Sequence, residues 1–563
     1  MSTLTEPRPD ERPQLPVGGD RVPWDHRRRT LAVAFGVLFA CVPFAAWWIG
    51  FTPLAVLDGL GDIRNLIGRM LPISWTNWPR LLVLLWETFL IAVAGTVLAV
   101  ALSIPVAFCA ARNTTPSRWL YGPARGIIAV TRAIPDLVFA IILVRVLGLG
   151  ALAGILALAF NSIGMLGKLY ADAIEEAEPA SIDAVRSVGA GRLQTITTAV
   201  SPQALPTFVG MGLYRLDINV RTSPVLGLVG AGGIGMELQN TLRQLRYDRG
   251  LAIVAMIFVL IVIVERVSSS VRAGVIGGED VARSRLAGPI EALERRRRHV
   301  GSSRIVMPWT PVRAGQGVAL VTLGALLLAG WRQLDVSPLD VLFAGPKLVA
   351  MLGNMWPPDF VTNISPAIAG LAESLAIAVV STFIGVLLSI PFAILGARTT
   401  AFGKVSAVFA RYGVVAVRGV PELILAIVFV AAVGLGPLAG ALALCIGTIG
   451  LSAKLMMDAL EQVPKMPMQA VSSTGATHTQ MVSASVVPQV IPNLIGTVLY
   501  QLDVNLRASV ILGIVGAGGI GFLLQNSVSQ LQYERTAAML IMIFVVVYGI
   551  ERLSTWLRGK VIG

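Results

Sequence analysis

Residues 214–235 read YRLDINVRTSPVLGLVGAGGIG, and residues 500–521 read YQLDVNLRASVILGIVGAGGIG. Over residues 207–235 and their copy, 17 of 29 positions are identical. The same offset of 286 residues carries Arg132 onto Arg418. Self-similarity that extends through most of a chain indicates a duplicated and fused unit. We therefore expect a pseudo-dimer within one polypeptide.

The composition is that of a membrane protein. Of the 563 residues, 55% are hydrophobic and 14% are charged, and the mean hydropathy is +0.75. Soluble proteins carry about 25% charged residues, and disordered chains have low hydrophobicity. An ordinary soluble enzyme and a disordered chain are both excluded. Because a spanning helix needs about 20 apolar residues, the length accommodates a dozen spans.

Apolar runs predict six spans in each half. Because that number is even, the two halves have parallel topology and are related by an axis along the membrane normal. The predicted spans lie near 31–49, 82–110, 125–147, 150–170, 205–229 and 250–267, and near 315–333, 368–396, 411–433, 435–455, 491–515 and 536–557.

The net charge of +13 indicates membrane topology, because the basic residues cluster beside apolar runs. Ten arginines lie in 266–313, and such stretches stay cytoplasmic. We expect a multi-pass protein of the plasma (inner) membrane with both termini cytoplasmic and with lipid as a partner. No basic surface is interleaved with aromatic residues, so no nucleic-acid partner is expected. The predicted division is a cytoplasmic tail (1–30), a first half (31–270), an Arg-rich cytoplasmic linker (271–312) and a second half (313–563).

The sequence contains no pattern for catalysis or metal binding. Three cysteines lie in apolar runs and three histidines are scattered, so neither a metal site nor a catalytic site is expected. GAGGIG fits G-x-G-x-x-G but follows a predicted span, not a strand, so we reject a dinucleotide site. The phosphate-binding pattern G-x-x-x-x-G-K-[ST] is absent from the sequence, so we expect this chain not to hydrolyse ATP in that manner.

The fifth predicted span of each half carries charged residues. Asp217 and Arg221 lie four residues apart and share a helix face with ion-pair spacing. Charges at mid-membrane are costly, yet the second half repeats them. One interpretation is a self-neutralising pair that holds the bundle together. The other is a central pathway in which the arginines of the two halves face each other and bind a tetrahedral oxyanion, because arginine donates bidentately. The candidate pathway residues are Asp217, Asn219, Arg221, Asp503, Asn505 and Arg507.

Two further sets of residues have open interpretations. Arg132 and Arg418, near the start of the third span, are either a second pathway ring or interfacial side chains that reach the membrane surface. Lys168 and Lys454 are interpreted as interfacial anchors. The glycines of the two GAGGIG runs serve either tight helix packing or a gate at the outer end of the pathway. The candidate gate residues are Gly230, Gly232, Gly233, Gly516, Gly518 and Gly519.

A polar segment follows the fourth span in each half. Residues 175–206 and 461–492 predict a short helix, a glycine-marked turn, a second short helix and proline-marked re-entry into the membrane. An ordinary amphipathic loop on the membrane surface is the alternative. The marker residues are Asp183, Ala184, Gly189 and Pro202 in the first copy, and Gln469, Ala470, Gly475 and Pro488 in the second.

These segments resemble the cytoplasmic loop of ABC importer permeases, whose pattern is E-A-A, three residues, G, nine residues, I-x-L-P. The Gly and Pro spacing holds in both copies, whereas the leading Glu is replaced by Asp183 and Gln469. In that family the loop docks on an ATPase subunit. The resemblance implies an all-α polytopic protein of about 12 transmembrane helices, like a type I ABC importer permease.

The GAGGIG stretches, with the charged residues before them, resemble permeases of phosphonate-type ABC importers over about 80–270 and 366–556. The resemblance implies import of phosphonate, phosphite or phosphate by alternating access. It also implies two copies of a cytosolic ATPase subunit and an extracytoplasmic substrate-binding protein. ATP and Mg would bind the partner ATPase, and no cofactor would bind this chain.

Two other classes of protein remain as alternatives. An ion-gradient-driven secondary anion transporter would use Asp217 and Asp503 as proton carriers, but it needs no paired docking loop. An intramembrane enzyme would need a catalytic constellation, and none is found in the sequence.

Overall fold

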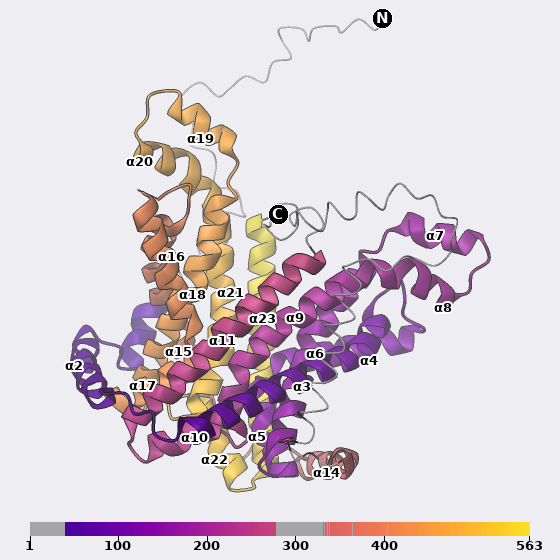
Figure 1. Ribbon diagram of the computed structural model, residues 1–563, viewed down its shortest axis with the longest axis horizontal. Helices are drawn as coiled ribbons and strands as arrows, with labels where there is room; N and C mark the ends of the chain where they lie inside the picture. Colours follow the sequence, from indigo (N-terminus) through magenta and orange to yellow (C-terminus); the bar gives the residue numbers. More distant parts are fainter. Residues whose placement is uncertain are drawn as a thin grey trace, which may run out of the picture.

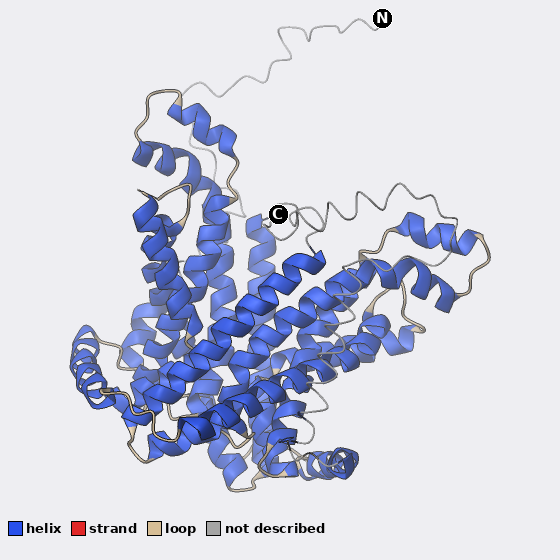
Figure 2. Ribbon diagram, in the orientation of Figure 1, coloured by secondary structure: helices blue, strands red, loops and turns tan. Residues whose placement is uncertain are grey.

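A computed structural model describes residues 40–276, 338–362, 364–401 and 403–562, together with the isolated residues 36, 330, 333, 334 and 336. All regular structure in these residues is helical (Figure 2). The predicted tail 1–30, most of the predicted linker 271–312 and most of the predicted span 315–333 lie outside the described residues.

The helices repeat at the offset of 286 residues that the sequence predicts. The first half contains a helix at Ala40–Trp48, then α2 (Pro53–Met70), α3 (Trp78–Ala110), α4 (Arg118–Ala133), α5 (Asp136–Leu147), α6 (Ala151–Glu175), α7 (Pro179–Ser187), α8 (Arg192–Thr195), the π-helical turn η2 (Ile196–Val200), α9 (Ser201–Gly227), α10 (Gly233–Arg243) and α11 (Tyr247–Ile276). The second half contains α14 (Pro338–Asn354), α15 (Ile364–Gly396), α16 (Lys404–Gly419), α17 (Glu422–Val433), α18 (Pro437–Glu461), α19 (Lys465–Ser472), α20 (His478–Met481), η4 (Val482–Val486), α21 (Val487–Ile514), α22 (Ile520–Ser529) and α23 (Tyr533–Ile562).

Seven described helices are long and apolar enough to cross a membrane, or ten if each of three bent helix pairs is one span. The prediction of an all-α membrane protein in two repeated halves is confirmed. Helix α9 is not among the seven, although its copy α21 lies within one of them. It carries one more charged side chain, because Arg215 takes the position of Gln501.

The third predicted span of each half is broken. Helices α4 and α5 meet at 95°, and α16 and α17 meet at 80°, whereas the sequence predicted continuous spans over 125–147 and 411–433. Pro135 and Pro421 lie at the breaks. Proline lacks an amide donor and favours an extended residue before it, and Ile134 and Val420 are extended. The break therefore directs α5 and α17 away from the axis of the preceding helix.

The two halves interlock. Helix α2 packs on α17 of the second half, and α14 packs reciprocally on α5 of the first. Helices α23 and α11 contact α4 and α16 in the same reciprocal way. Figure 1 shows α7–α8 and α19–α20 at two separate tips on one side, and α5, α10 and α22 at the opposite end. The largest apolar core contains side chains from both halves, so the halves form one molecule around a shared centre.

Candidate functional site

A cavity of about 720 Å³ lies between the two halves. Repeat-related residues line it from both sides, so it follows the pseudo-twofold relation of the halves. The repeat-related pairs are Arg132 and Arg418, Ile134 and Val420, Pro135 and Pro421, Asp136 and Glu422, Asn161 and Gly447, Met165 and Leu451, Ile218 and Val504, Arg221 and Arg507, Thr222 and Ala508, and Val225 and Ile511. The cavity is therefore the place where the predicted charged residues of the two halves approach one another.

Arg221 and Arg507 line the cavity and are held by carboxylates. An Nη of Arg221 lies 3.5 Å from Asp217 and 2.8 Å from Glu265, both measured to carboxylate oxygens. Arg507 lies 2.5 Å from Asp503 and 3.8 Å from Glu551. The predicted i,i+4 pairing is present in both halves. The glutamates of α11 and α23 were not singled out in the sequence.

The same arginines also join the halves. Arg221 donates to the backbone carbonyl of Arg418 at 3.4 Å, and Arg507 donates to that of Arg132 at 3.3 Å. These carbonyls lie beside the proline breaks, where the helical hydrogen-bond pattern is interrupted. Each arginine thus donates one hydrogen bond to the opposite half, and its side chain lies at the cavity wall.

Arg132 and Arg418 also line the cavity, but their surroundings differ. The Arg132 guanidinium pairs with Glu551 on α23. Among the described residues, no ion pair is found for the Arg418 guanidinium. The repeated arginines are therefore chemically unequal.

Asn219 and Asn505 lie apart from the cavity. The Asn219 amide donates to Thr96 at 2.9 Å, and the Asn505 amide donates to Thr382 and Thr448, each at 2.9 Å. Both asparagines are fully buried. They join the fifth span to the neighbouring helices and do not line the pathway side of that span. Asp217 is likewise absent from the cavity wall, whereas Asp503 lines it.

Three polar cavity residues of the first half have no matching polar side chain at the repeat-equivalent position of the second wall. Arg215 lines the cavity where the second half has Gln501, and Asn161 lines it where the second half has Gly447. Lys168 lines the cavity as well, although the sequence analysis placed it as an interfacial anchor. The signal for Arg215 and Asn161 was available in the sequence, as a difference between otherwise matching repeat copies.

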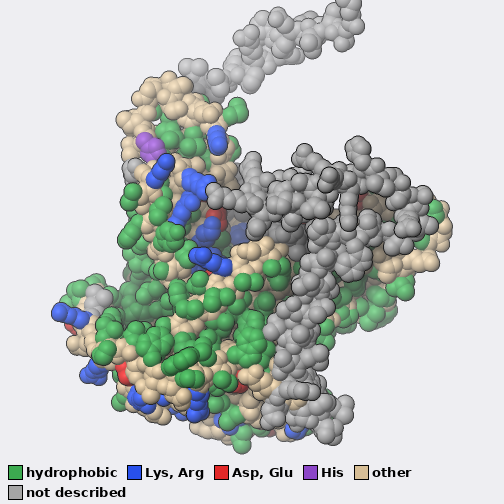
Figure 3. Space-filling model, in the orientation of Figure 1, with side chains coloured by type: hydrophobic (Ala, Val, Ile, Leu, Met, Phe, Trp, Pro, Cys, Tyr) green, Lys and Arg blue, Asp and Glu red, His purple; other side chains and the backbone are tan. Residues whose placement is uncertain are grey.

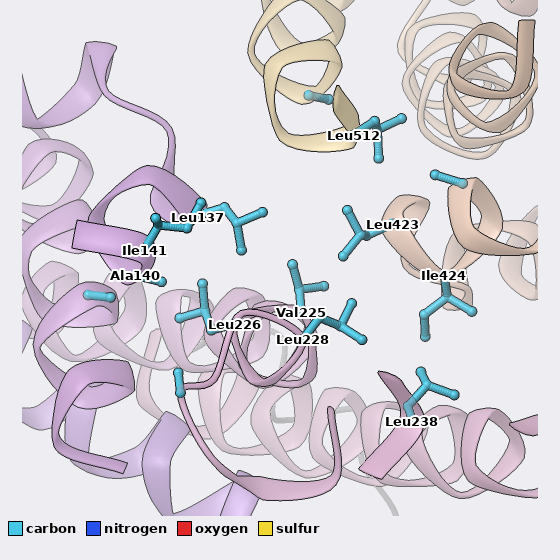
Figure 4. Close-up of a cluster of buried hydrophobic side chains, with 14 of the residues drawn as sticks. Leu137, Ala140, Ile141, Val225, Leu226, Leu228, Leu238, Leu423, Ile424 and Leu512 are labelled. Carbon is cyan, nitrogen blue, oxygen red and sulfur yellow. The ribbon is translucent and has the colours of Figure 1, made fainter. Parts of the chain in front are cut away.

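Apolar side chains of both halves form part of the cavity wall. Val225, Leu423 and Leu512 line the cavity and belong to the apolar core shared by the halves. Figure 4 shows them with Leu226 and Leu228 in one cluster contributed by both halves. Leu512 and Leu226 are almost fully buried. These side chains form an apolar layer that both halves share and that borders the cavity.

The glycine-rich turns pack directly against α3 in the first half and α15 in the second. Gly230, Gly232 and Gly233 have φ of +100°, +83° and +71°, and Gly516, Gly518 and Gly519 have φ of +94°, +82° and +78°. The Gly233 amide donates to Glu87 at 3.0 Å. A Cβ at Gly233 would lie 2.3 Å from the Thr88 hydroxyl, and one at Gly519 would lie 2.3 Å from that of Ser374. The turns require glycine for both conformation and close packing, and a hinge role stays a hypothesis.

The two polar segments project from the molecule as helical hairpins. Asp183, Ala184, Gln469 and Ala470 are exposed on α7 and α19, and Gly189 (φ +82°) and Gly475 (φ +80°) form the turns with open space around them. Pro202 and Pro488 lie in the first turns of α9 and α21. The hairpin tips lie on one side of the molecule (Figure 1).

The first hairpin is tied to the rest of its half by an arginine that the second lacks. Arg192 on α8 donates to the carbonyls of Thr114 at 2.8 Å and Pro116 at 3.1 Å. The equivalent position in α20 is His478. The side chains at this position of the two hairpins therefore differ in type and charge.

The visible surface carries an apolar band between two more polar ends. Figure 3 shows hydrophobic side chains across the middle of the molecule, with basic side chains gathered at its two ends. Such a distribution fits helices that cross a membrane.

Comparison with known proteins agrees with this architecture. Residues 103–275 and 385–562 each match the family described as "Binding-protein-dependent transport system inner membrane component". The "Phosphate-import permease protein PhnE" of Mycolicibacterium smegmatis is 44% identical over 518 residues, which is 92% of each chain. The "Phosphite transport system permease protein PtxC" of Stutzerimonas stutzeri is 38% identical over 250 residues, covering 44% of this chain and 90% of its own.

A solved structure of the "MetNI methionine ABC transporter" in inward-facing conformations is 24% identical, covers 34% of this chain and 95% of its own, and has a TM-score of 0.31. The two family matches correspond to the two halves predicted from the repeat. They favour the importer interpretation over the gradient-driven carrier. The chain belongs to the binding-protein-dependent transport system inner membrane components, the permease subunits of ABC importers, and carries two copies of the family unit fused in one polypeptide.

Proposed function

We propose that this permease carries phosphate, phosphite or phosphonate oxyanions inward through the cavity between its halves. The observation that supports it most strongly is the set of basic side chains at the cavity wall, contributed by both halves. Arginine donates along two parallel N–H directions, which match two oxygens of a tetrahedral oxyanion. The two relatives that match over 92% and 90% of their own length are named for phosphate import and phosphite transport.

The carboxylates beside Arg221 and Arg507 fit a transport role, not permanent capture. Each guanidinium is already paired with an aspartate and a glutamate. A competing carboxylate lowers the net gain from binding an anion, and transport requires release as well as binding. In this proposal Asp217 and Asp503 act with the arginines to keep binding reversible.

In this proposal, a separate ATPase drives the conformational change of the permease. The hairpins α7–α8 and α19–α20 would each dock one subunit of a cytosolic ATPase dimer, which binds ATP and Mg. Val188 and Leu193 on the first hairpin, and Met466 on the second, are exposed apolar side chains suited to such a contact. Closure of the ATPases would move the two hairpins together and open the apolar layer at Leu226 and Leu512.

In the proposed orientation, the hairpins and both termini lie on the cytoplasmic side of a bacterial-type inner membrane. An extracytoplasmic binding protein would deliver the anion at the end formed by α5, α10 and α22. The Arg-rich stretch 266–313 would then be cytoplasmic, as the positive-inside rule requires.

Uptake into proteoliposomes tests the proposal. Vesicles holding this chain, its ATPase and its binding protein are given labelled phosphate or methylphosphonate, with ATP on either side and with or without an ionophore. We expect uptake that needs ATP on the ATPase side and is unchanged by the ionophore. Uptake that follows an ion gradient and ignores ATP would refute it, and a better rate with one label would identify the preferred anion.

A further inference from the structure

The two walls of the cavity carry different charge. The first half contributes four basic residues and one acidic residue, and the second contributes two of each. The first-half residues are Arg132, Lys168, Arg215, Arg221 and Asp136, and the second-half residues are Arg418, Arg507, Glu422 and Asp503. Among repeat-related positions this difference arises at Arg215 and Lys168 on the first wall and at Asp503 on the second.

Arg215 is a buried cation held toward the cavity. It is 6% exposed, and its Nε donates to the Ser162 hydroxyl at 2.7 Å. One Nη lies 3.6 Å from the Met165 sulfur, which is a weak acceptor. Asp136 lines the same wall of the cavity, but no ion pair is found for Arg215 among the described residues. The guanidinium is therefore fixed at one edge and retains donor capacity.

The second half uses the matching position differently. Gln501 donates to Asn505 at 3.0 Å and to Thr448 at 3.3 Å. It is fully buried and does not line the cavity. Gly447 leaves space that the Glu422 side chain fills, since a Cβ there would lie 2.7 Å from its carboxylate oxygen. The second wall therefore presents a carboxylate where the first presents the Asn161 amide.

The repeat-related lysines, Lys168 and Lys454, also differ between the two walls. Lys454 pairs with Asp458 at 2.5 Å and does not line the cavity. Lys168 lines the cavity, and no ion pair is found for it within the described part of the chain. Asn161, Met165 and Lys168 recur at i, i+4 and i+7, so they lie on one face of α6. Arg215 on α9 contacts this face through Met165.

We propose that the oxyanion binds off the pseudo-twofold axis, on the first wall, at a subsite formed by Arg215, Lys168 and Asn161. The inference rests on the proposed function and adds which half holds the substrate. Arg215 supplies a planar fork of donors, Lys168 a second charge and Asn161 a neutral donor, a set that suits a tetrahedral dianion. The second wall carries two arginines and two carboxylates, so it has no net charge and attracts the anion less strongly than the first wall.

Binding of phosphate and methylphosphonate to the purified permease–ATPase complex, without the binding protein, tests the subsite. The line width of the ³¹P resonance reports weak, fast binding. We expect saturable broadening with the unaltered protein, and an affinity about tenfold or more lower in R215Q and in K168A, because each removes a charge-assisted hydrogen bond. R215Q introduces the residue that the second half has at this position. K168A provides a second test if the R215Q protein cannot be produced in folded form.

K454A is the matched control, because its lysine lies outside the cavity. It should bind like the unaltered protein. Equal affinity in R215Q, K168A and K454A, or no saturable broadening with the unaltered complex, would overturn the off-axis subsite. ATP-driven uptake by the unaltered complex, measured in parallel, would remain in that case if the proposed function is correct. Its absence would instead refute the proposed function.

Discussion

The ion pair between Arg507 and Asp503 gives a prediction that separates a structural role from a transport role. The pair is 2.5 Å long, and Asp503 is 9% exposed. Replacing only the arginine, as in Arg507→Met, leaves a buried carboxylate beside Glu551. Replacing both residues, as in D503N/R507M, removes the uncompensated charge at Asp503.

The two variants should differ markedly in stability. Breaking one partner of a buried pair costs about 3–5 kcal/mol, and replacing both is often close to neutral. Because Asp503 borders the cavity, we take the lower end, about 3 kcal/mol, for R507M. The double variant loses mainly packing and the contact with the Arg132 carbonyl, about 1 kcal/mol. We therefore expect R507M to be about 2 kcal/mol less stable than D503N/R507M.

Equilibrium unfolding in mixed detergent–SDS micelles measures these differences, and D503N alone completes the double-mutant cycle. Uptake is measured on the same proteins. Both R507M and the double variant should lose transport, since both lack the pathway arginine. If R507M were as stable as the double variant, the ion-pair argument would be wrong. Retained transport in the stable double variant would refute the pathway role of Arg507.

Three further outcomes are expected. Gly519→Ala should lower stability by about 1–2 kcal/mol, because φ is +78° and the new Cβ would collide with the Ser374 hydroxyl. Unfolding in the same micelles measures this loss, and an unchanged free energy of unfolding would refute the packing argument. Arg192→Ala should loosen the first hairpin and reduce ATPase activity stimulated by the binding protein, because it removes the contacts with the Thr114 and Pro116 carbonyls; unchanged stimulation would contradict it. Hydrogen bonds from Thr362, and more weakly from the Val361 amide, lower the pKa of Asp359. Its contribution to stability is therefore present above the unfolded pKa of about 3.9 and is lost as pH falls through the folded value. The stability difference between the unaltered protein and D359N should vanish only in that acidic range.

The repeat could be predicted in detail because it needs no tertiary information. The helices of the two halves start and end at nearly the same offset that the sequence indicates. The i,i+4 pairing of Asp217 with Arg221 followed from helical spacing alone, and it is present. The helix breaks at Pro135 and Pro421 were harder to predict, because the apolar runs over 125–147 and 411–433 resemble unbroken spans. Only the angle between the helices identifies the breaks.

Side-chain roles within one helix were the least predictable. Asn219 lies two residues before Arg221 on the fifth span, yet Asn219 joins neighbouring helices and Arg221 lines the cavity. Neighbours in sequence point in different directions around a helix, so which of them meets the cavity depends on how the helix is rotated in the bundle. Lys168 was placed at the interface for the same reason, because its spacing does not say which helices surround it.

The sequence alone determined the membrane class, the duplicated halves, the paired hairpins and the presence of charge in the fifth span. Hydrophobicity, repeat offset and helical spacing are local properties of the chain, and each can be read without coordinates. Only the tertiary structure decided that Glu265 and Glu551 hold the arginines, that apolar side chains of both halves border the cavity, and that Arg215 and Lys168 line one wall. These facts depend on contacts between residues far apart in the chain, which the packing of whole helices fixes.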